Sequence, residues 1–231
     1  MTERLQRLKA VPAPTMHLWL MLVLTFTTGI NDAVGYLGLD KVFTGNMTGN
    51  VVVLGMAMVG GNDLPVLGPA LALVGFMVGA AVGGRALRGS AAAWSTVCTA
   101  LFGVVAFLML ALGVVLLIDG DHPEKPLEVT ITTIAAVAMG MQAAAARHIA
   151  VKDVTTVVVT STLTGLAADS WLGSGKGGGS GRRLAAVALI LLGALVGALL
   201  LKAHLGLSLL LAGVLIAGAT AVGEWHRRAT A

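Results

Sequence analysis

The stretch Val42-Phe-Thr-Gly-Asn-Met-Thr-Gly-Asn50 decides how this chain is expected to fold. It opens an apolar run with threonine, glycine and asparagine, which favour extended backbone and helix caps over helix interiors. A second apolar run opens in the same way, with Val158-Val-Thr-Ser-Thr-Leu-Thr-Gly165. After either opening, the apolar sequence that remains is shorter than the about 20 residues that a helix needs to cross a bilayer. We therefore predict that each run forms an extended strand-like segment followed by a half-helix.

The composition of the chain places these runs in a membrane. Of the 231 residues, 57% are hydrophobic and only 11% are charged, whereas about 25% are charged in an average soluble domain. The 31 glycines suit helices that approach each other closely in lipid. The net charge of +4 is confined to loops and termini, so it indicates a membrane protein and no nucleic-acid partner. The single cysteine, Cys98, excludes an internal disulfide.

Eight uncharged apolar runs follow one another along the chain. Six of them are predicted to span the bilayer, and the other two are the runs quoted above. Together they predict a single polytopic membrane domain over residues 1–231. The eight runs cover residues 10–31, 42–62, 64–84, 91–118, 129–146, 154–168, 184–201 and 203–223.

The two halves of the chain resemble each other. Three short segments of the first half recur in order in the second half, at offsets of 111, 116 and 118 residues. This order predicts an internal repeat, with repeat A over about residues 16–118 and repeat B over about residues 128–225. The aligned positions are Gly29-Ile-Asn31 with Gly140-Met-Gln142, then Thr44, Thr48 and Gly49 with Thr160, Thr164 and Gly165, then Gly75, Val78, Gly79 and Ala80 with Gly193, Val196, Gly197 and Ala198.

Loop charges select a topology. If all eight runs spanned, the basic residues at 85–88 and 147–152 would lie outside and the acidic loop at 119–124 inside, against the positive-inside rule. If the two short runs instead return to their own side, the basic loops and both termini are cytoplasmic. Each half then has three spans, and this odd number inverts the second half. The predicted fold is an all-α integral membrane protein, an inverted repeat with 3+3 spans and one re-entrant strand and half-helix in each half.

In this topology the two half-helices begin near Met47 and Leu163 and point their N-termini at one another in mid-membrane. A helix N-terminus carries unpaired N–H groups and about half a positive charge, and transporters with broken helices bind solutes at such ends. Neither opening segment contains Lys or Arg, so we expect a small anion or a neutral polar metabolite. The alternative is that these residues only cap and pack the helices. The expected substrate-binding residues are Asn31, Asp32, Thr44, Asn46, Thr48, Gly49, Gln142, Thr160, Thr162, Thr164 and Gly165.

Asp32 is the clearest single candidate, because an ionisable residue inside a membrane segment is costly and often functional. It follows Asn31 in the first run and aligns with Ala143 in the second half, so its charge breaks the repeat. We expect it to couple or gate transport, or to act as a counter-ion. The alternative is a hydrogen bond to a neighbouring helix end near the outer interface.

Motifs of enzymes and metal sites do not occur in this sequence. It has no H-E-x-x-H, G-x-S-x-G, Walker or dinucleotide pattern, and no His, Cys or carboxylate cluster at ligand spacing. We therefore expect no enzyme activity, no cofactor and no bound metal. The G-x-x-x-G patterns at 79–83 and 193–197 bring helices together within one chain or in a homodimer.

The segment Thr28-Gly-Ile-Asn-Asp-Ala-Val-Gly-Tyr-Leu37, together with the Thr-Gly-Asn stretch after it, resembles the YoaK-like family of bacterial inner-membrane proteins, a domain of unknown function. The likeness extends to Gly140-Met-Gln-Ala-Ala and to 160–165, with Leu166 standing where the first repeat has Asn50. The resemblance implies a multi-pass protein of the bacterial plasma membrane and supplies no substrate.

The leading hypothesis from the sequence is a small-solute transporter or permease-like protein, with the lipid bilayer and a small molecule or ion as its partners. Two other classes stay open. One is a passive channel, and the other is a structural or regulatory membrane subunit in which the polar openings only pack.

Overall fold

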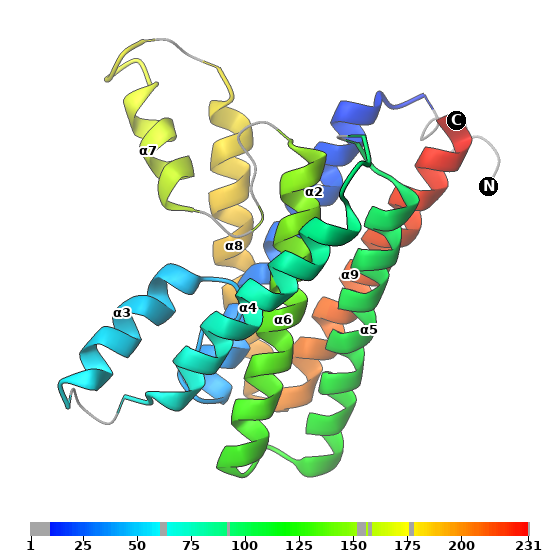
Figure 1. The fold of residues 1–231 in the computed structure, drawn as a ribbon. Helices are drawn as coiled ribbons and strands as arrows, with labels where there is room; N and C mark the ends of the chain where they lie inside the picture. The colour runs from blue at the N-terminus through cyan, green and yellow to red at the C-terminus, as the bar shows by residue number, and fades with distance from the viewer. Residues whose placement is uncertain are drawn as a thin grey trace.

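Six long helices form a bundle, and two short helices lie beside it (Figure 1). The computed structural model describes residues 10–60, 64–91, 93–151, 156, 159–175 and 178–230. Each long helix is long and apolar enough to cross a bilayer, whereas α3 and α7 have 12 and 9 residues. The elements are α2 (Ala13–Ala33), its π-helical continuation η1 (Val34–Gly38), α3 (Met47–Met58), α4 (Leu67–Ala86), α5 (Thr96–Asp119), α6 (Lys125–Ile149), α7 (Thr160–Ala168), α8 (Ser180–Leu201) and α9 (Leu205–Thr230).

These lengths confirm an all-helical membrane protein with six candidate spans. The predicted strands are wrong for the residues that the structure describes, which contain no β-strand. The segment 39–46 before α3 is irregular, because no neighbouring strand is there to complete its hydrogen bonds. The second half-helix is predicted to begin near Leu163, but α7 already begins at Thr160.

Local signals explain several helix boundaries. Pro14 and Pro126 lie in the first turns of α2 and α6, where the missing N–H removes no helical hydrogen bond. Ser95 caps α5, because its side chain accepts a hydrogen bond from the Cys98 N–H at 3.2 Å. Helix α6 ends where Ala150 adopts a left-handed conformation with φ 55°.

Helices α2 and α8 run in the same direction with their backbones almost touching. A Cβ at Gly193 would lie 3.2 Å from the Cα of Phe26, and a Cβ at Gly197 would lie 3.0 Å from the Cα of Ile30. Residue numbers therefore rise together along the two helices, which identifies a parallel pair. Only glycine permits backbones to approach this closely.

Helices α4 and α6 form a parallel pair with the same contacts. A Cβ at Gly79 would lie 3.0 Å from the Cα of Val137, and a Cβ at Gly83 would lie 3.5 Å from the Cα of Met141. Val137 and Met141 stand 111 residues after the two α2 residues that touch α8, as the alignment of the first spans predicts.

The contacts correct one part of the predicted alignment. They match the Gly79–Gly83 pair of α4 with the Gly193–Gly197 pair of α8, which is an offset of 114 residues. The predicted offset of 118 is wrong by four residues, about one helical turn. Glycine recurs every four residues along α4, at Gly75, Gly79 and Gly83, so the letters alone do not fix the register.

Helices α5 and α9 run in opposite directions. A Cβ at Gly113 would lie 2.9 Å from the backbone nitrogen of Leu210, and a Cβ at Gly213 would lie 3.0 Å from that of Leu110. Residue numbers rise along one helix as they fall along the other, so the pair is antiparallel. Each helix thus places one glycine against a leucine of the other helix: Gly113 lies against Leu210, and Gly213 lies against Leu110.

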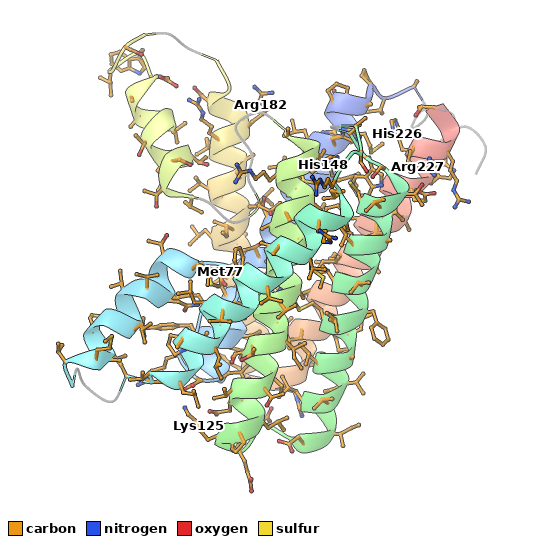
Figure 2. The ribbon with its side chains drawn as sticks, viewed as in Figure 1. Met77, Lys125, His148, Arg182, His226 and Arg227 are labelled. Atoms are coloured by element: carbon orange, nitrogen blue, oxygen red, sulfur yellow. The ribbon has the colours of Figure 1, made fainter. Side chains whose placement is uncertain are left out.

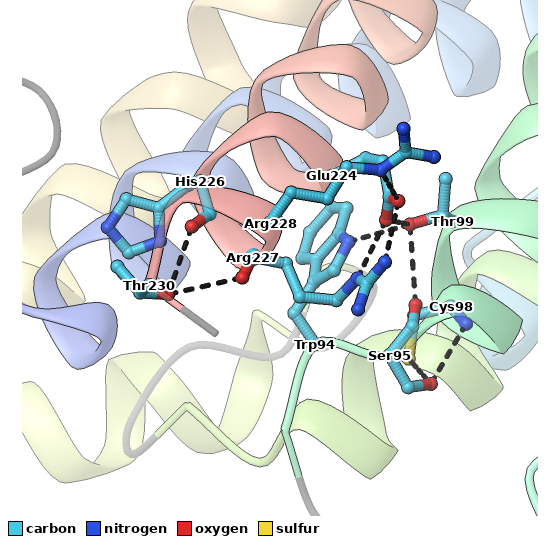
Figure 3. Close-up of polar contacts among 9 residues, drawn as sticks. All are labelled: Trp94, Ser95, Cys98, Thr99, Glu224, His226, Arg227, Arg228 and Thr230. Carbon is cyan, nitrogen blue, oxygen red and sulfur yellow. Dashed lines mark hydrogen bonds and ion pairs between the residues drawn. The ribbon is translucent and has the colours of Figure 1, made fainter.

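Polar contacts tie the bundle at its two ends. At the end where α2 begins and α9 ends, Glu224 accepts hydrogen bonds from Thr99 Oγ1 at 2.8 Å, Arg227 Nη2 at 2.7 Å and Arg228 Nε at 2.6 Å (Figure 3). The indole of Trp94 donates to Thr99 Oγ1 at 2.9 Å, so the cluster joins α5 to α9.

The opposite end is held by acidic residues. Lys125 at the start of α6 pairs with Asp40, whose side chain is buried in the segment before α3. Asp121 accepts a hydrogen bond at 2.8 Å from the Leu205 N–H at the start of α9. Figure 2 shows His148, Arg182, His226 and Arg227 toward the first end and Lys125 at the opposite end.

Candidate functional site

Asp32, near the end of α2, holds the segment that leads into α3. Its Oδ1 accepts a hydrogen bond from the Gly45 N–H at 2.7 Å, and longer ones from the Asn46 N–H and Thr44 Oγ1, both at 3.4 Å. A carboxylate at this position faces the positive end of α3, where an anion is stabilised. The charge of Asp32 therefore fixes where α3 begins.

Two asparagines complete the start of α3. The side chain of Asn46 caps the helix and accepts a hydrogen bond from the Gly49 N–H at 3.2 Å. The carboxamide of Asn50 binds both backbone groups of Phe43, accepting from its N–H at 2.8 Å and donating to its carbonyl oxygen at 2.6 Å. A Cβ at Gly49 would lie 2.6 Å from the Phe43 ring. The Thr-Gly-Asn motif thus positions the segment and the helix as one unit.

Helix α7 is anchored differently. Its first turn is closed by the Leu163 N–H donating to the Val159 carbonyl at 2.9 Å, with no side-chain cap at Val159. At its other end, Arg183 of α8 donates to the carbonyl of Gly165 and to the carboxylate of Asp169, both at 2.8 Å. Residues 154, 155, 157 and 158 of the predicted run 154–168 lie outside the described residues.

A cavity of about 280 Å³ lies between the start of α3 and the start of α7. Four of the expected substrate-binding residues line it: Asp32, Asn46, Thr48 and Thr160. Among the described residues, no donor reaches Oδ2 of Asp32 and no Lys, Arg or His pairs with this carboxylate. The lining residues are Asp32, Gly45, Asn46, Met47, Thr48, Phe76, Val159, Thr160 and Ile190.

Asn31 and Gln142 do not line the cavity but lie buried where α2 meets α6. The Asn31 amide donates to the Met139 sulfur at 3.3 Å, and the Gln142 amide donates to Thr28 Oγ1 at 3.3 Å. Met139 is the residue 111 positions after Thr28, so the two contacts are equivalent in the two halves. The side-chain oxygens of both amides are buried without a partner in the described part of the chain.

The other expected residues support the two short helices. None of them lines the cavity, so they do not contact what the cavity holds. Thr44 is buried beside Asp32, Gly49 lies against Phe43, Thr162 is buried in α7, Thr164 donates to the Thr160 carbonyl at 2.9 Å, and Gly165 accepts from Arg183.

A larger hollow of about 940 Å³ lies between the ends of α4 and α6. It is lined by Arg88, Arg147 and His148 and reaches Phe76, which also lines the cavity. These helix ends lie toward the end of the bundle where α2 begins and α9 ends (Figure 1). We call this hollow the basic vestibule.

A smaller hollow of about 370 Å³ lies at the opposite end. Among its lining residues are Ala198, Leu201 and Lys202, which stand 114 positions after Gly84, Leu87 and Arg88 of the basic vestibule. The two hollows are therefore equivalent places in the two halves. The smaller one does not reach Ile190, the residue equivalent to Phe76.

Sequence reasoning missed Phe76 and Ile190. Both are apolar residues in apolar spans, so nothing in their chemistry marks them. With the register corrected to 114, they become one equivalent pair. That pairing is the only sequence signal that relates the two residues to a shared place in the fold.

The helices and the cavity define the class: a multi-pass helical membrane protein with polar groups and a carboxylate at the meeting point of two short helices. The chain belongs to the family described as Protein of unknown function (DUF1275), which matches residues 20–222. It is 30% identical over 151 residues to the UPF0700 transmembrane protein YoaK of Bacillus subtilis (strain 168), a match that covers 65% of each chain. The predicted resemblance to the YoaK-like family is thereby confirmed. No solved structure matches the chain.

Proposed function

We propose that this protein transports a small polar solute across the bacterial plasma membrane and binds it in the cavity between α3 and α7. The observation that carries the proposal is a cavity lined by a carboxylate and hydroxyl groups between the starts of two helices too short to span. Irregular backbone is tolerated at membrane depth only where it is buried in protein or lines a cavity. Charged residues inside membrane segments are a mark of solute pathways.

The helix directions support the re-entrant placement of α3 and α7. If both short helices crossed the membrane, α5 and α9 would be the fourth and eighth spans and would run in the same direction. They run in opposite directions, as the third and sixth spans of an inverted repeat do. The equivalent parallel pairs, α2 with α8 and α4 with α6, support the same inverted repeat.

The unequal hollows support alternating access. The basic vestibule reaches a residue of the cavity wall, whereas its equivalent at the other end does not. By the positive-inside rule the basic end is cytoplasmic, with both termini. The structure then corresponds to an inward-facing state, and exchanging the conformations of the two repeats produces the outward-facing state.

The same observations favour a transporter over the two other classes. A passive channel needs access from both ends in one conformation, and of these two hollows only the basic vestibule shares a lining residue, Phe76, with the cavity. A subunit that only packs needs no hollow between the starts of α3 and α7. Nothing in the proposed role requires an enzyme activity, a cofactor or a metal.

Thiol labelling tests whether the cavity is reached by water, and from which side. The native Cys98 is buried, so it is replaced by Ala and one cysteine is introduced at Thr160. A charged methanethiosulfonate reagent is added to membrane vesicles of either orientation. The matched control is Phe107→Cys, because this side chain is 68% exposed on a spanning helix and is expected to face lipid.

The Thr160→Cys thiol is expected to react rapidly from the cytoplasmic side, whereas Phe107→Cys stays slow because a thiol in lipid does not ionise. Equal, slow reaction at both positions would refute a water-accessible site, and with it the transport proposal. Rapid reaction at Thr160→Cys from the outer side alone would reverse the proposed direction of opening.

A further inference from the structure

We infer that the cavity binds its solute through a cationic nitrogen, with Asp32 as the counter-ion. This inference rests on the proposed function, because it takes the cavity between α3 and α7 as the substrate site. It names a different class of solute from the small anion or neutral metabolite expected from the sequence. Three features of the cavity wall carry it.

The first feature is that the two carboxylate oxygens of Asp32 differ in their hydrogen bonds. Oδ1 accepts the hydrogen bonds from Gly45, Asn46 and Thr44, whereas Oδ2 has no donor among the described residues. The residue lines the cavity, and no described Lys, Arg or His neutralises it. A charge held in a weakly polar interior is stabilised by an opposite charge at hydrogen-bond distance.

The second feature is that three N–H groups at the entry to α3 already have acceptors within the chain. Helix N-termini attract anions because their N–H groups are unpaired. Here the N–H groups of Gly45 and Asn46 donate to Asp32, and that of Gly49 donates to the side chain of Asn46. A second anion at this end would displace a carboxylate that the chain itself supplies, or would be repelled by it.

The third feature is the rest of the lining. Among the described residues, no Lys, Arg or His lines the cavity, and the polar groups besides Asp32 are the neutral side chains of Asn46, Thr48 and Thr160. Phe76 and Ile190 add apolar surface. The volume of about 280 Å³ lies just below the range of about 300–1,000 Å³ typical of pockets for drug-sized ligands. The wall therefore suits a small amine with a short apolar part.

The basic vestibule carries charge of the opposite sign, from Arg88 and Arg147, and His148 also lines it. None of the three lines the cavity, and basic residues at this end follow the positive-inside rule. Charges at a mouth mainly change the rate at which a charged solute enters. They set how fast a cation arrives, while Asp32 determines what the cavity holds.

Binding of a defined probe tests the inference. Purified protein is unfolded by heat in ethylammonium chloride, in sodium chloride and in sodium acetate at one ionic strength, and the midpoints are compared. Four variants accompany the wild type: Asp32→Asn, Asp32→Glu, Thr160→Val and Thr164→Val. Thr164 is the matched control, because it lies one turn further along α7 and does not line the cavity.

Ethylammonium is expected to raise the midpoint of the wild type and of Thr164→Val, since ligand binding stabilises the folded state. With Asp32→Asn, at least about ten times more ethylammonium should be needed for the same rise in the midpoint. Thr160→Val should weaken it less, and Asp32→Glu should retain part of it. Because Asp32 also fixes the start of α3, the Thr160→Val and Asp32→Glu results decide the case if Asp32→Asn does not fold.

Two results would overturn the inference. One is stabilisation by acetate that Thr160→Val abolishes, with none by ethylammonium. In that case the cavity is a binding site, so the proposed function stands and the charge assignment fails. The other is no effect of ethylammonium, or an effect that Asp32→Asn and Thr160→Val leave unchanged. The thiol-labelling experiment then decides separately whether the cavity is a solute site at all.

Discussion

Replacing Gly29 and Gly140 by alanine, one at a time, tests whether the two halves of the chain are built alike. The added methyl group at Gly29 would lie 2.7 Å from the backbone nitrogen of Ala194, and at Gly140 it would lie 2.8 Å from that of Ala80. Carbon contacts are normally about 3.5–4.0 Å. Each pair of helices must therefore separate by about 1 Å, because the obstacle is backbone and cannot rotate away.

The size of the effect follows from two opposing contributions. Overpacking a filled interface costs about 1–3 kcal/mol, and an obstacle made of backbone favours the upper part of that range. Alanine in place of glycine recovers up to about 1 kcal/mol of helix propensity. We expect each variant to lose about 1–2 kcal/mol of unfolding free energy, by the difference of these estimates. The losses of unfolding free energy at Gly29 and Gly140 should be similar, because the two glycines make equivalent contacts.

The assay is unfolding of the purified protein in one detergent, with Gly103→Ala as the matched control. Gly103 is also helical, but a Cβ there meets nothing within 4 Å, so this variant should be as stable as the wild type or more so. A loss at Gly29 with none at Gly140, or losses no larger than at Gly103, would refute the equivalence of the two interfaces.

Three further variants test the polar contacts. Asn50→Ala leaves both backbone groups of Phe43 without their partner, so unfolding should become easier by about 2 kcal/mol; an unchanged denaturation midpoint would contradict this role. Glu224→Gln removes the shared charge partner of Arg227 and Arg228, and it should lower the thermal midpoint more at low salt than at high salt. Lys125→Met should destabilise more than Lys125→Met combined with Asp40→Asn, since only the single variant leaves a buried carboxylate unpaired; equal losses would argue against the pair.

The spans could be predicted because their signal is compositional. Long uncharged runs have one low-energy outcome in lipid, and the threonine-rich and asparagine-rich openings marked α3 and α7 as different. The register of the alignment between the two repeats could not be predicted from the sequence alone. Glycines spaced four apart along α4 allow two alignments with α8, and only the backbone contacts at Gly79 and Gly193 distinguish them.

The polar half of the candidate site was also accessible from the sequence. Asp32, Asn46, Thr48 and Thr160 stood out because hydroxyl, amide and carboxylate groups are rare in apolar runs. Phe76 and Ile190 did not stand out, because the sequence does not distinguish an apolar residue that faces a cavity from one that faces lipid. The sequence pointed to a small anion or a neutral metabolite, because it does not show that Asp32 accepts the hydrogen bond of the Gly45 N–H.

In the proposed inverted repeat, one carboxylate is enough for a site that the two halves share. The glycine contacts repeat between the halves, whereas Asp32 aligns with Ala143 and occurs once. Because the cavity lies where the starts of α3 and α7 meet, Asp32 reaches it from α2 while Phe76 and Ile190 border it from α4 and α8. In the proposed cycle, closing one hollow and opening the other changes which of these two residues meets the open side. The carboxylate stays in the wall throughout, so the scaffold can be symmetric while the binding group need not be duplicated.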